Sequence, residues 1–172
     1  MFSKPRQVEA KSELYDTAVR ALMRRAYSVH EMKQHLGRRS DNDELIKLVI
    51  ELLKKSNLLD DERFAKQFAR QRTEIRRQGK FRIARELRNR GIPDRHIEAA
   101  LAETAKETDE AAIVRQRIDR KLRTLRGEIT ENKMSSIYRS LLRAGFSADV
   151  VRHELKSLTR EEVPEVESQT ED

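Results

Sequence analysis

An internal repeat is the feature of this sequence that most constrains its fold. When the sequence is placed over itself so that Gly91 falls on Gly145, each glycine stands four residues after a leucine and just before a large apolar residue. Apolar residues around the two glycines coincide as well: Ile83, Leu87, Ile97 and Leu101 fall on Ile137, Leu141, Val151 and Leu155. A weaker copy lies nearer the N-terminus, around Met32 and Leu36. Such repeats are supersecondary units that stack on their neighbours, so we expect an array of similar units.

The apolar residues of each copy recur at helical spacing, and no segment shows the sustained alternation of a strand. We therefore predict an all-α protein of three tandem three-helix repeats in an elongated, curved array. The predicted first helices are 12–26, 60–78 and 108–126, the second helices 28–38, 80–90 and 130–144, and the third helices 41–56, 93–106 and 147–158. The predicted units are 12–59, 60–107 and 108–159, after a flexible segment at 1–11. A disordered tail is predicted at 160–172, because residues 161–172 include six acidic residues and no basic ones.

Signals for helix ends agree with these ranges. Ser28 with Glu31 matches a capping box, and Asp41 with Glu44 matches a similar one. The two repeated glycines stand where a helix commonly ends in a left-handed residue.

Composition excludes several classes of protein. The 172 residues include no cysteine, which excludes disulfides, thiolate metal sites and a thiol nucleophile. The longest dense apolar stretch, Leu48 to Leu53, is interrupted by Glu51 and is far shorter than the roughly 20 residues of a membrane span. The N-terminal residues lack the apolar core of a signal peptide. We expect a soluble, cytoplasmic, monomeric protein with no membrane partner.

The positive charge is concentrated in one segment. The whole chain carries a formal net charge of +7, but the residues from Arg63 to Arg95 include 12 basic and three acidic residues, a net charge of +9. At helical spacing, Phe64, Phe68 and Ile75 share one side of the first helix, opposite the basic residues. Few acidic residues are placed to pair with the basic ones, which favours binding of phosphate or an acidic protein over a solvated face. The predicted binding residues, here called the basic ridge, are Lys66, Arg70, Arg77, Arg82, Arg85 and Arg88.

Phe81 is the one aromatic residue near the basic ridge. The repeat alignment places it close to the buried side, so stacking on nucleic-acid bases is poorly supported. Any contact with nucleic acid should be electrostatic, salt-sensitive and weakly sequence-selective.

Catalytic constellations are weak in this sequence. Asp60, Asp61 and Glu62 form the one dense carboxylate cluster, which could hold a magnesium ion. The cluster also stands at a predicted helix start, where acidic residues cap N–H groups and oppose the macrodipole, and capping is the favoured interpretation. The four histidines are scattered, and no phosphate-binding loop is present. We expect no enzyme activity, no metal and no cofactor.

One segment resembles the most characteristic motif of the RecX family, bacterial regulators of the RecA recombinase: Leu58-Leu59-Asp60-Asp61-Glu62-Arg63-Phe64-Ala65. Family-like strings also run from Arg85 to Ile92 and from Leu141 to Phe146. The sequence departs from the family at residues 76–80, where Arg-Arg-Gln-Gly-Lys replaces the usual Lys-Gly-aromatic-Gly-Pro and only Gly79 is retained.

The resemblance implies a non-catalytic modulator, mainly an inhibitor, that binds the RecA–DNA filament. Members of the family restrain filament growth, ATPase activity, strand exchange and the co-protease activity that induces the SOS response. A stand-alone, sequence-tolerant DNA-binding protein is the alternative, since helix–turn–helix units can bind duplex DNA. A metal-dependent nuclease using the carboxylate cluster is the least favoured hypothesis.

Overall fold

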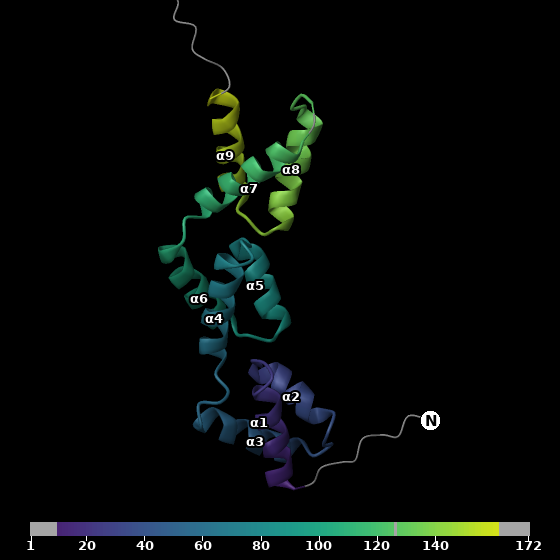
Figure 1. The fold of residues 1–172 in the computed structure, drawn as a ribbon. Helices are drawn as coiled ribbons and strands as arrows, with labels where there is room; N and C mark the ends of the chain where they lie inside the picture. The colour runs from purple at the N-terminus through teal and green to yellow at the C-terminus, as the bar shows by residue number, and fades with distance from the viewer. Residues whose placement is uncertain (1–9, 126, 162–172) are drawn as a thin grey trace, which may run out of the picture.

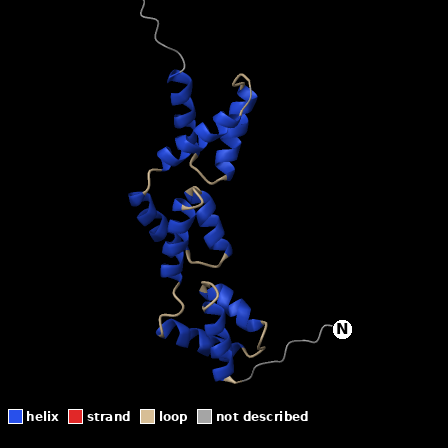
Figure 2. Ribbon diagram, viewed as in Figure 1, coloured by secondary structure: helices blue, strands red, loops and turns tan. Residues whose placement is uncertain are grey.

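The computed structural model of the chain describes residues 10–125 and 127–161, with side chains as far as Leu158. Within these ranges the chain is helical and contains no strand (Figure 1, Figure 2). The helices are α1 (Lys11–Leu22), α2 (Val29–Gly37), α3 (Asp43–Lys55), α4 (Asp61–Glu74), α5 (Lys80–Asn89), α6 (Asp94–Glu107), α7 (Glu110–Thr124), α8 (Glu131–Arg143) and α9 (Ala148–Glu161). The prediction of an all-α fold is confirmed. None of the helices in the described ranges is long and apolar enough to cross a membrane.

Three consecutive helices enclose each of three separate apolar cores. We call α1–α3 the first unit, α4–α6 the second and α7–α9 the third. Residues that coincide in the sequence repeat occupy the centres of these cores: Met32 and Leu36, Ile83 and Leu87, and Ile137 and Leu141. The units follow one another along the long axis of the molecule (Figure 1). The apolar periodicity therefore identifies the buried positions of every unit. The predicted tail at 160–172 and the segment at 1–11 lie largely outside the described residues.

Two of the predicted helix-end signals are present as expected. The hydroxyl of Ser28 accepts the Glu31 N–H at 3.1 Å, and the Glu31 carboxylate accepts the Ser28 N–H at 3.1 Å, so the capping box is formed. Gly91 and Gly145 have φ angles of 72° and 90°, the left-handed conformation that ends a helix.

The predicted cap of α3 is wrong. Asn42, not Asp41, is the N-cap, and its side chain accepts the Leu45 N–H at 3.0 Å. The buried Ser40 explains the shift, because its hydroxyl accepts the Asn42 N–H at 3.2 Å and holds the chain outside the helix for one more residue.

The end of α4 also differs from the prediction. The helix ends at Glu74, and Ile75, which was expected on the apolar side, is 73% exposed. Arg77 then adopts a left-handed φ of 50°. The chain leaves the helix early because Gly79 contacts the third unit. Its N–H donates to the Ala144 carbonyl at 2.9 Å.

The two junctions between units use the same contact. At the first junction, the Ser28 hydroxyl, at the N-cap of α2, donates to the Arg90 carbonyl at 2.6 Å. At the second, Gly79, at the N-cap of α5, donates its N–H to the Ala144 carbonyl. Arg90 and Ala144 coincide in the sequence repeat, and each directly precedes the left-handed glycine of its unit. The second helix of the first unit and that of the second unit thus each begin on the glycine turn of the next unit.

Close approach makes glycine necessary in these turns. A Cβ added to Gly91 would overlap the side chain of His30, which lies in the first turn of α2. A Cβ added to Gly145 would overlap Arg82, in the first turn of α5, and would meet the Gly79 carbonyl oxygen at 2.8 Å. Both glycines therefore serve a left-handed turn and a tight junction between units at once.

Gly145→Ala should test this junction. The left-handed φ and the overlap with α5 together should lower the free energy of unfolding by about 2–4 kcal/mol. Gly37→Ala is the matched control, because Gly37 lies in α2 with open space around it, and alanine should stabilise that helix by up to about 1 kcal/mol. Urea denaturation followed by circular dichroism measures both changes. Equal stability of the two variants would contradict the packed junction.

Candidate functional site

The structure divides the basic ridge between two places. Lys66 and Arg70 lie on α4 at the side that meets α6. The Lys66 ammonium is 3.1 Å from the Glu62 carboxylate and 3.2 Å from that of Glu103, which belongs to α6. The Arg70 guanidinium is 2.9 Å from the carboxylate of Glu74. These two cations are therefore already paired within the second unit.

The cations on α5 form the other group. Arg82 lies 3.0 Å from the Glu86 carboxylate, which also lies 3.3 Å from Arg72 of α4. At the far end of α5, Arg88 pairs with Asp94 at 2.7 Å. Glu86 thus joins α4 and α5. Arg82 is half-buried and lies beside Gly145 of the third unit.

The expectation that the basic ridge is largely unpaired is wrong for four of its six residues: Lys66, Arg70, Arg82 and Arg88. Folding brings Glu103 in from outside the basic segment and places the few acidic residues inside it against basic ones. Within the described part of the chain, Arg77 and Arg85 have no carboxylate within 4 Å. The assignment of the six residues to a binding surface stays a prediction.

A hollow of about 410 Å³ lies where α5 meets the turn between α8 and α9. It spans the second and third units, and its lining residues are Phe81, Arg82, Arg85, Leu142, Arg143 and Gly145. We call it the α5/α8 hollow. Arg85 and Arg143 are exposed, and neither makes an ion pair among the described residues. The hollow therefore combines three cations with two exposed apolar side chains, and one of the cations, Arg82, pairs with Glu86.

Phe81 is not close to the buried side, contrary to prediction. Its side chain is 59% exposed, and the Lys80 ammonium lies 5.5 Å from its ring centroid. The reason is the junction: the Phe81 N–H donates to the Gly145 carbonyl at 3.0 Å, which fixes the first turn of α5 with its aromatic side chain outward. The repeat alignment gave no signal for this orientation, because it compares positions within units and not contacts between them.

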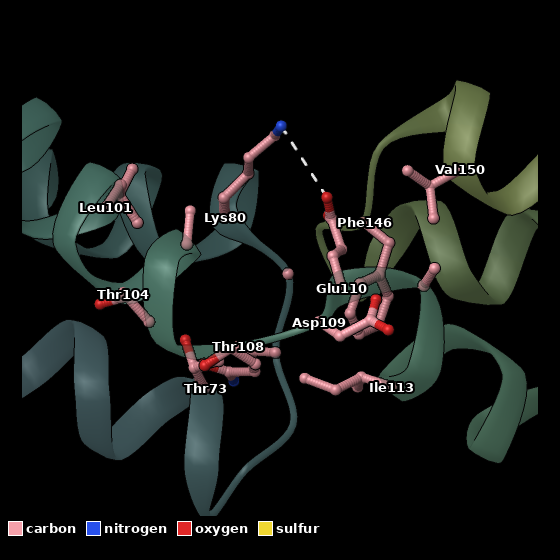
Figure 3. A pocket seen from close by; sticks show the side chains of 14 residues that line it. Thr73, Lys80, Leu101, Thr104, Thr108, Asp109, Glu110, Ile113, Phe146 and Val150 are labelled. Atoms are coloured by element: carbon pink, nitrogen blue, oxygen red, sulfur yellow. Dashed lines mark ion pairs between the residues drawn. The ribbon is translucent and has the colours of Figure 1, made fainter.

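A second cavity, of about 400 Å³, lies inside the junction of the second and third units (Figure 3). Leu101 of α6 faces it from one side, and Phe146 and Val150 face it from the other. The Lys80 ammonium lies 3.8 Å from the Glu110 carboxylate beside it (Figure 3). The lining is mainly apolar and its ion pair joins the two units, so this cavity belongs to the packing between units.

The carboxylate cluster has structural partners. Asp60 is the N-cap of α4 and accepts the Arg63 N–H at 3.0 Å, which confirms the capping interpretation. Asp61 crosses the first junction and accepts the Val29 N–H at 2.8 Å. Glu62 pairs with Lys66. In the part of the chain that the structure describes, no group of three or more His, Asp or Glu side chains could hold a metal ion.

Repeated three-helix units joined end to end are the architecture of a helical-repeat protein. Comparison with known proteins identifies the family to which the chain belongs. Residues 60–101 match the family model for the second three-helix domain of RecX. The chain is 34% identical over 134 residues to the regulatory protein RecX of Prosthecochloris aestuarii, covering 78% of this chain and 85% of that protein. It is 36% identical over 145 residues to that of Halorhodospira halophila, covering 83% and 86%. The chain belongs to the RecX family.

Solved structures share the fold. The crystal structure of RecX from Lactobacillus salivarius matches with a TM-score of 0.77 and 23% identity, over 87% of this chain and 97% of that chain. A second crystal structure of a regulatory protein RecX matches with a TM-score of 0.75 and 20% identity, over 86% and 71%.

Asp61 provides a test of the first junction. Burial raises the pKa of Asp61, although the hydrogen bond from Val29 acts in the opposite direction. Asp61→Ala removes the acceptor of a partly buried N–H and should lower the free energy of unfolding by about 1–2 kcal/mol. Asp61→Asn keeps an acceptor oxygen without a charge, so its stability at pH 7 should stay within about 0.5 kcal/mol of the parent or exceed it.

The pH dependence follows from the raised pKa of Asp61. As pH falls, the folded protein protonates Asp61 before the unfolded chain does, so this carboxyl stabilises the fold more below its pKa than at neutral pH. As pH is lowered from 7 to 3, the free energy of unfolding of the parent should rise relative to that of Asp61→Asn. Urea denaturation at several pH values across that range measures this difference. A difference that stays constant, or that changes in the opposite direction, would exclude burial as the dominant effect on this group.

Proposed function

We propose that this protein is a non-catalytic regulator of RecA that acts in the cytoplasm by binding the RecA–DNA filament. Its main effect is inhibition: it restrains filament growth, ATP hydrolysis, strand exchange and the co-protease activity that induces the SOS response. Membership of the RecX family carries this proposal, since the related proteins are named regulatory proteins.

The shape of the molecule supports filament binding. Three similar units lie in a row, and α2, α5 and α8 lie along the same side of that row (Figure 1). A filament also repeats along one direction, so a row of units can contact neighbouring protomers together. Inhibition then requires higher affinity for the arrangement of protomers that cannot extend or hydrolyse ATP than for the active one.

The α5/α8 hollow is the part of the surface best suited to this contact. Among the residues that the structure describes, no carboxylate pairs with Arg85 or Arg143, whereas Lys66 and Arg70 would first have to give up their ion pairs when a partner binds. Phe81 and Leu142 add exposed apolar area beside the cations, a combination typical of protein interfaces. We therefore place the α5/α8 hollow at the centre of the filament-binding surface and the α4 cations at its margin.

Direct binding to DNA is the second candidate function, and the exposed Phe81 favours it. Aromatic side chains stack on the bases of single strands, and arginines neutralise the phosphates. Phe81 stands among Arg82, Arg85 and Arg143, which supplies both kinds of contact in one place.

Paired substitutions can test the filament-binding surface. Arg85→Ala with Arg143→Ala should weaken inhibition of the RecA ATPase on single-stranded DNA, and co-sedimentation with the filament, at least about tenfold. Lys66→Ala with Arg70→Ala removes the same charge from the α4 side and should change both readouts less than about threefold. Helical circular dichroism checks that both variants fold. Stronger loss in the second variant would move the interface to the α4 side, and parent protein that neither binds nor inhibits filaments would falsify the proposed function.

Phe81→Ala distinguishes the second candidate. Binding of the chain alone to single-stranded DNA should fall about 5- to 150-fold, since stacking of a base on an aromatic ring contributes about 1–3 kcal/mol. Ile75→Ala is the matched control, because Ile75 is also exposed and apolar but is not among the residues that line the hollow. Fluorescence anisotropy over a range of salt concentrations measures both affinities. Absence of any complex of the parent with DNA at moderate salt rejects direct binding and leaves filament regulation intact.

A further inference from the structure

One arginine at the second junction is half-buried without a carboxylate partner. Arg117 lies in α7, and its Nη2 donates at 3.2 Å to the carbonyl of Arg76, in the turn between α4 and α5. The Nε of Arg117 is buried and has no hydrogen-bond partner. Within the described part of the chain, no ion pair includes this residue. A guanidinium that is partly removed from water and lacks a counter-charge is costly, so a bound anion would stabilise it.

Two further cations lie close to Arg117. Arg120 is exposed and follows it by three residues, so both share one face of α7. Arg82 belongs to the second unit and packs against Gly145. The guanidinium carbon of Arg117 lies 5.6 Å from the ring centroid of Phe146, the residue after that glycine. Burial lowers the pKa of Arg117, and the charges of Arg120 and Arg82 lower it further. We call Arg82, Arg117 and Arg120 the arginine cluster.

Nearby carboxylates cancel little of the charge of the arginine cluster. The Glu86 carboxylate lies 3.0 Å from Arg82, but it is shared with Arg72 of α4, at 3.3 Å. On α7, Asp119 is two residues from Arg117, a spacing at which helical side chains do not face each other. The arginine cluster therefore keeps a positive charge that comes from two units and meets at one glycine turn.

We propose that the arginine cluster binds a phosphate group. Phosphate has acceptor oxygens in a tetrahedral arrangement, so guanidinium groups that approach from two helices can donate to it together. A carboxylate has two oxygens in one plane and suits a single guanidinium better. A phosphate that accepts N–H groups of Arg82 and Arg120 stands beside Arg117 and supplies the counter-charge that Arg117 lacks.

Titration of the full chain with inorganic phosphate at constant ionic strength tests the site. The backbone amide signal of Phe146 in NMR spectra should shift and saturate, whereas acetate should leave it nearly unchanged. Arg117→Met removes the charge but keeps an unbranched side chain against Phe146, and it should weaken phosphate binding at least about fivefold. Arg24→Met is the matched control, since Arg24 is exposed in the first unit and makes no ion pair among the described residues. It should change the affinity less than about twofold.

A second variant keeps the test valid if Arg117→Met does not fold. Arg120 is exposed, so Arg120→Met should preserve the spectrum of the folded protein and weaken phosphate binding at least about threefold. Phosphate affinities that are equal in the parent, Arg120→Met and Arg24→Met would overturn the proposal. A Phe146 shift that acetate reproduces at the same ionic strength would overturn it as well, because the arginine cluster would then show no preference for phosphate.

Two sources carry this chemistry: the backbone of nucleic acid and free phosphate compounds such as nucleotides. If the source is a strand, single-stranded oligothymidylate should displace inorganic phosphate, and a strand of equal length with uncharged methylphosphonate linkages should not. If the source is a free compound, a nucleoside triphosphate should displace inorganic phosphate and the oligothymidylate should not. Both results support the phosphate site. RecA is absent from every mixture, so failure of this site and failure of the proposed filament regulation are separate outcomes.

Discussion

One contact organises this molecule: the carbonyl that precedes a left-handed glycine accepts a hydrogen bond from the unit before it. Arg90 and Ala144 supply these carbonyls, and Ser28 and Gly79 supply the donors. The contact sets where α2 and α5 begin, and at the second junction it also sets where α4 must end. It turns three small cores, none of which is shared between units, into one row. The row in turn creates both the α5/α8 hollow and the junction cavity, because each lies where two units meet.

The net charge of a sequence segment does not give the charge of the surface that the segment forms after folding. The segment from Arg63 to Arg95 has a net charge of +9, yet most of the basic ridge is neutralised by nearby carboxylates after folding. Lys66 illustrates the cause, since one of its two partners, Glu103, lies in the next helix but one and outside that segment. Arg85 and Arg143, which make no ion pair among the described residues, come from different units. A polyanionic or acidic partner would therefore meet a smaller and more apolar surface than the charge run alone indicates.

The helices and buried positions could be predicted because they follow from local rules. Helical spacing located the core residues, and the Ser28–Glu31 capping box and the two left-handed glycines marked helix ends. The errors at Ile75 and Phe81 share one physical origin. Both residues sit next to the second junction, where hydrogen bonds to Ala144 and Gly145 override the helical periodicity and turn an apolar side chain outward. The candidate site was predicted in part, since Arg82 and Arg85 belong to it but Arg143 and Leu142 were not connected with them.

The sequence by itself determined that this chain is a row of three-helix units with a basic middle, because repeat spacing, helix capping and composition depend on residues close together in the chain. Its family could be read from a short local string for the same reason. Only the tertiary structure decided which cations lack an ion pair among the described residues and which aromatic side chain faces outward. Those properties depend on which residues of neighbouring units come within a few ångströms of each other, and that is set by the close approach of two backbones at a glycine turn.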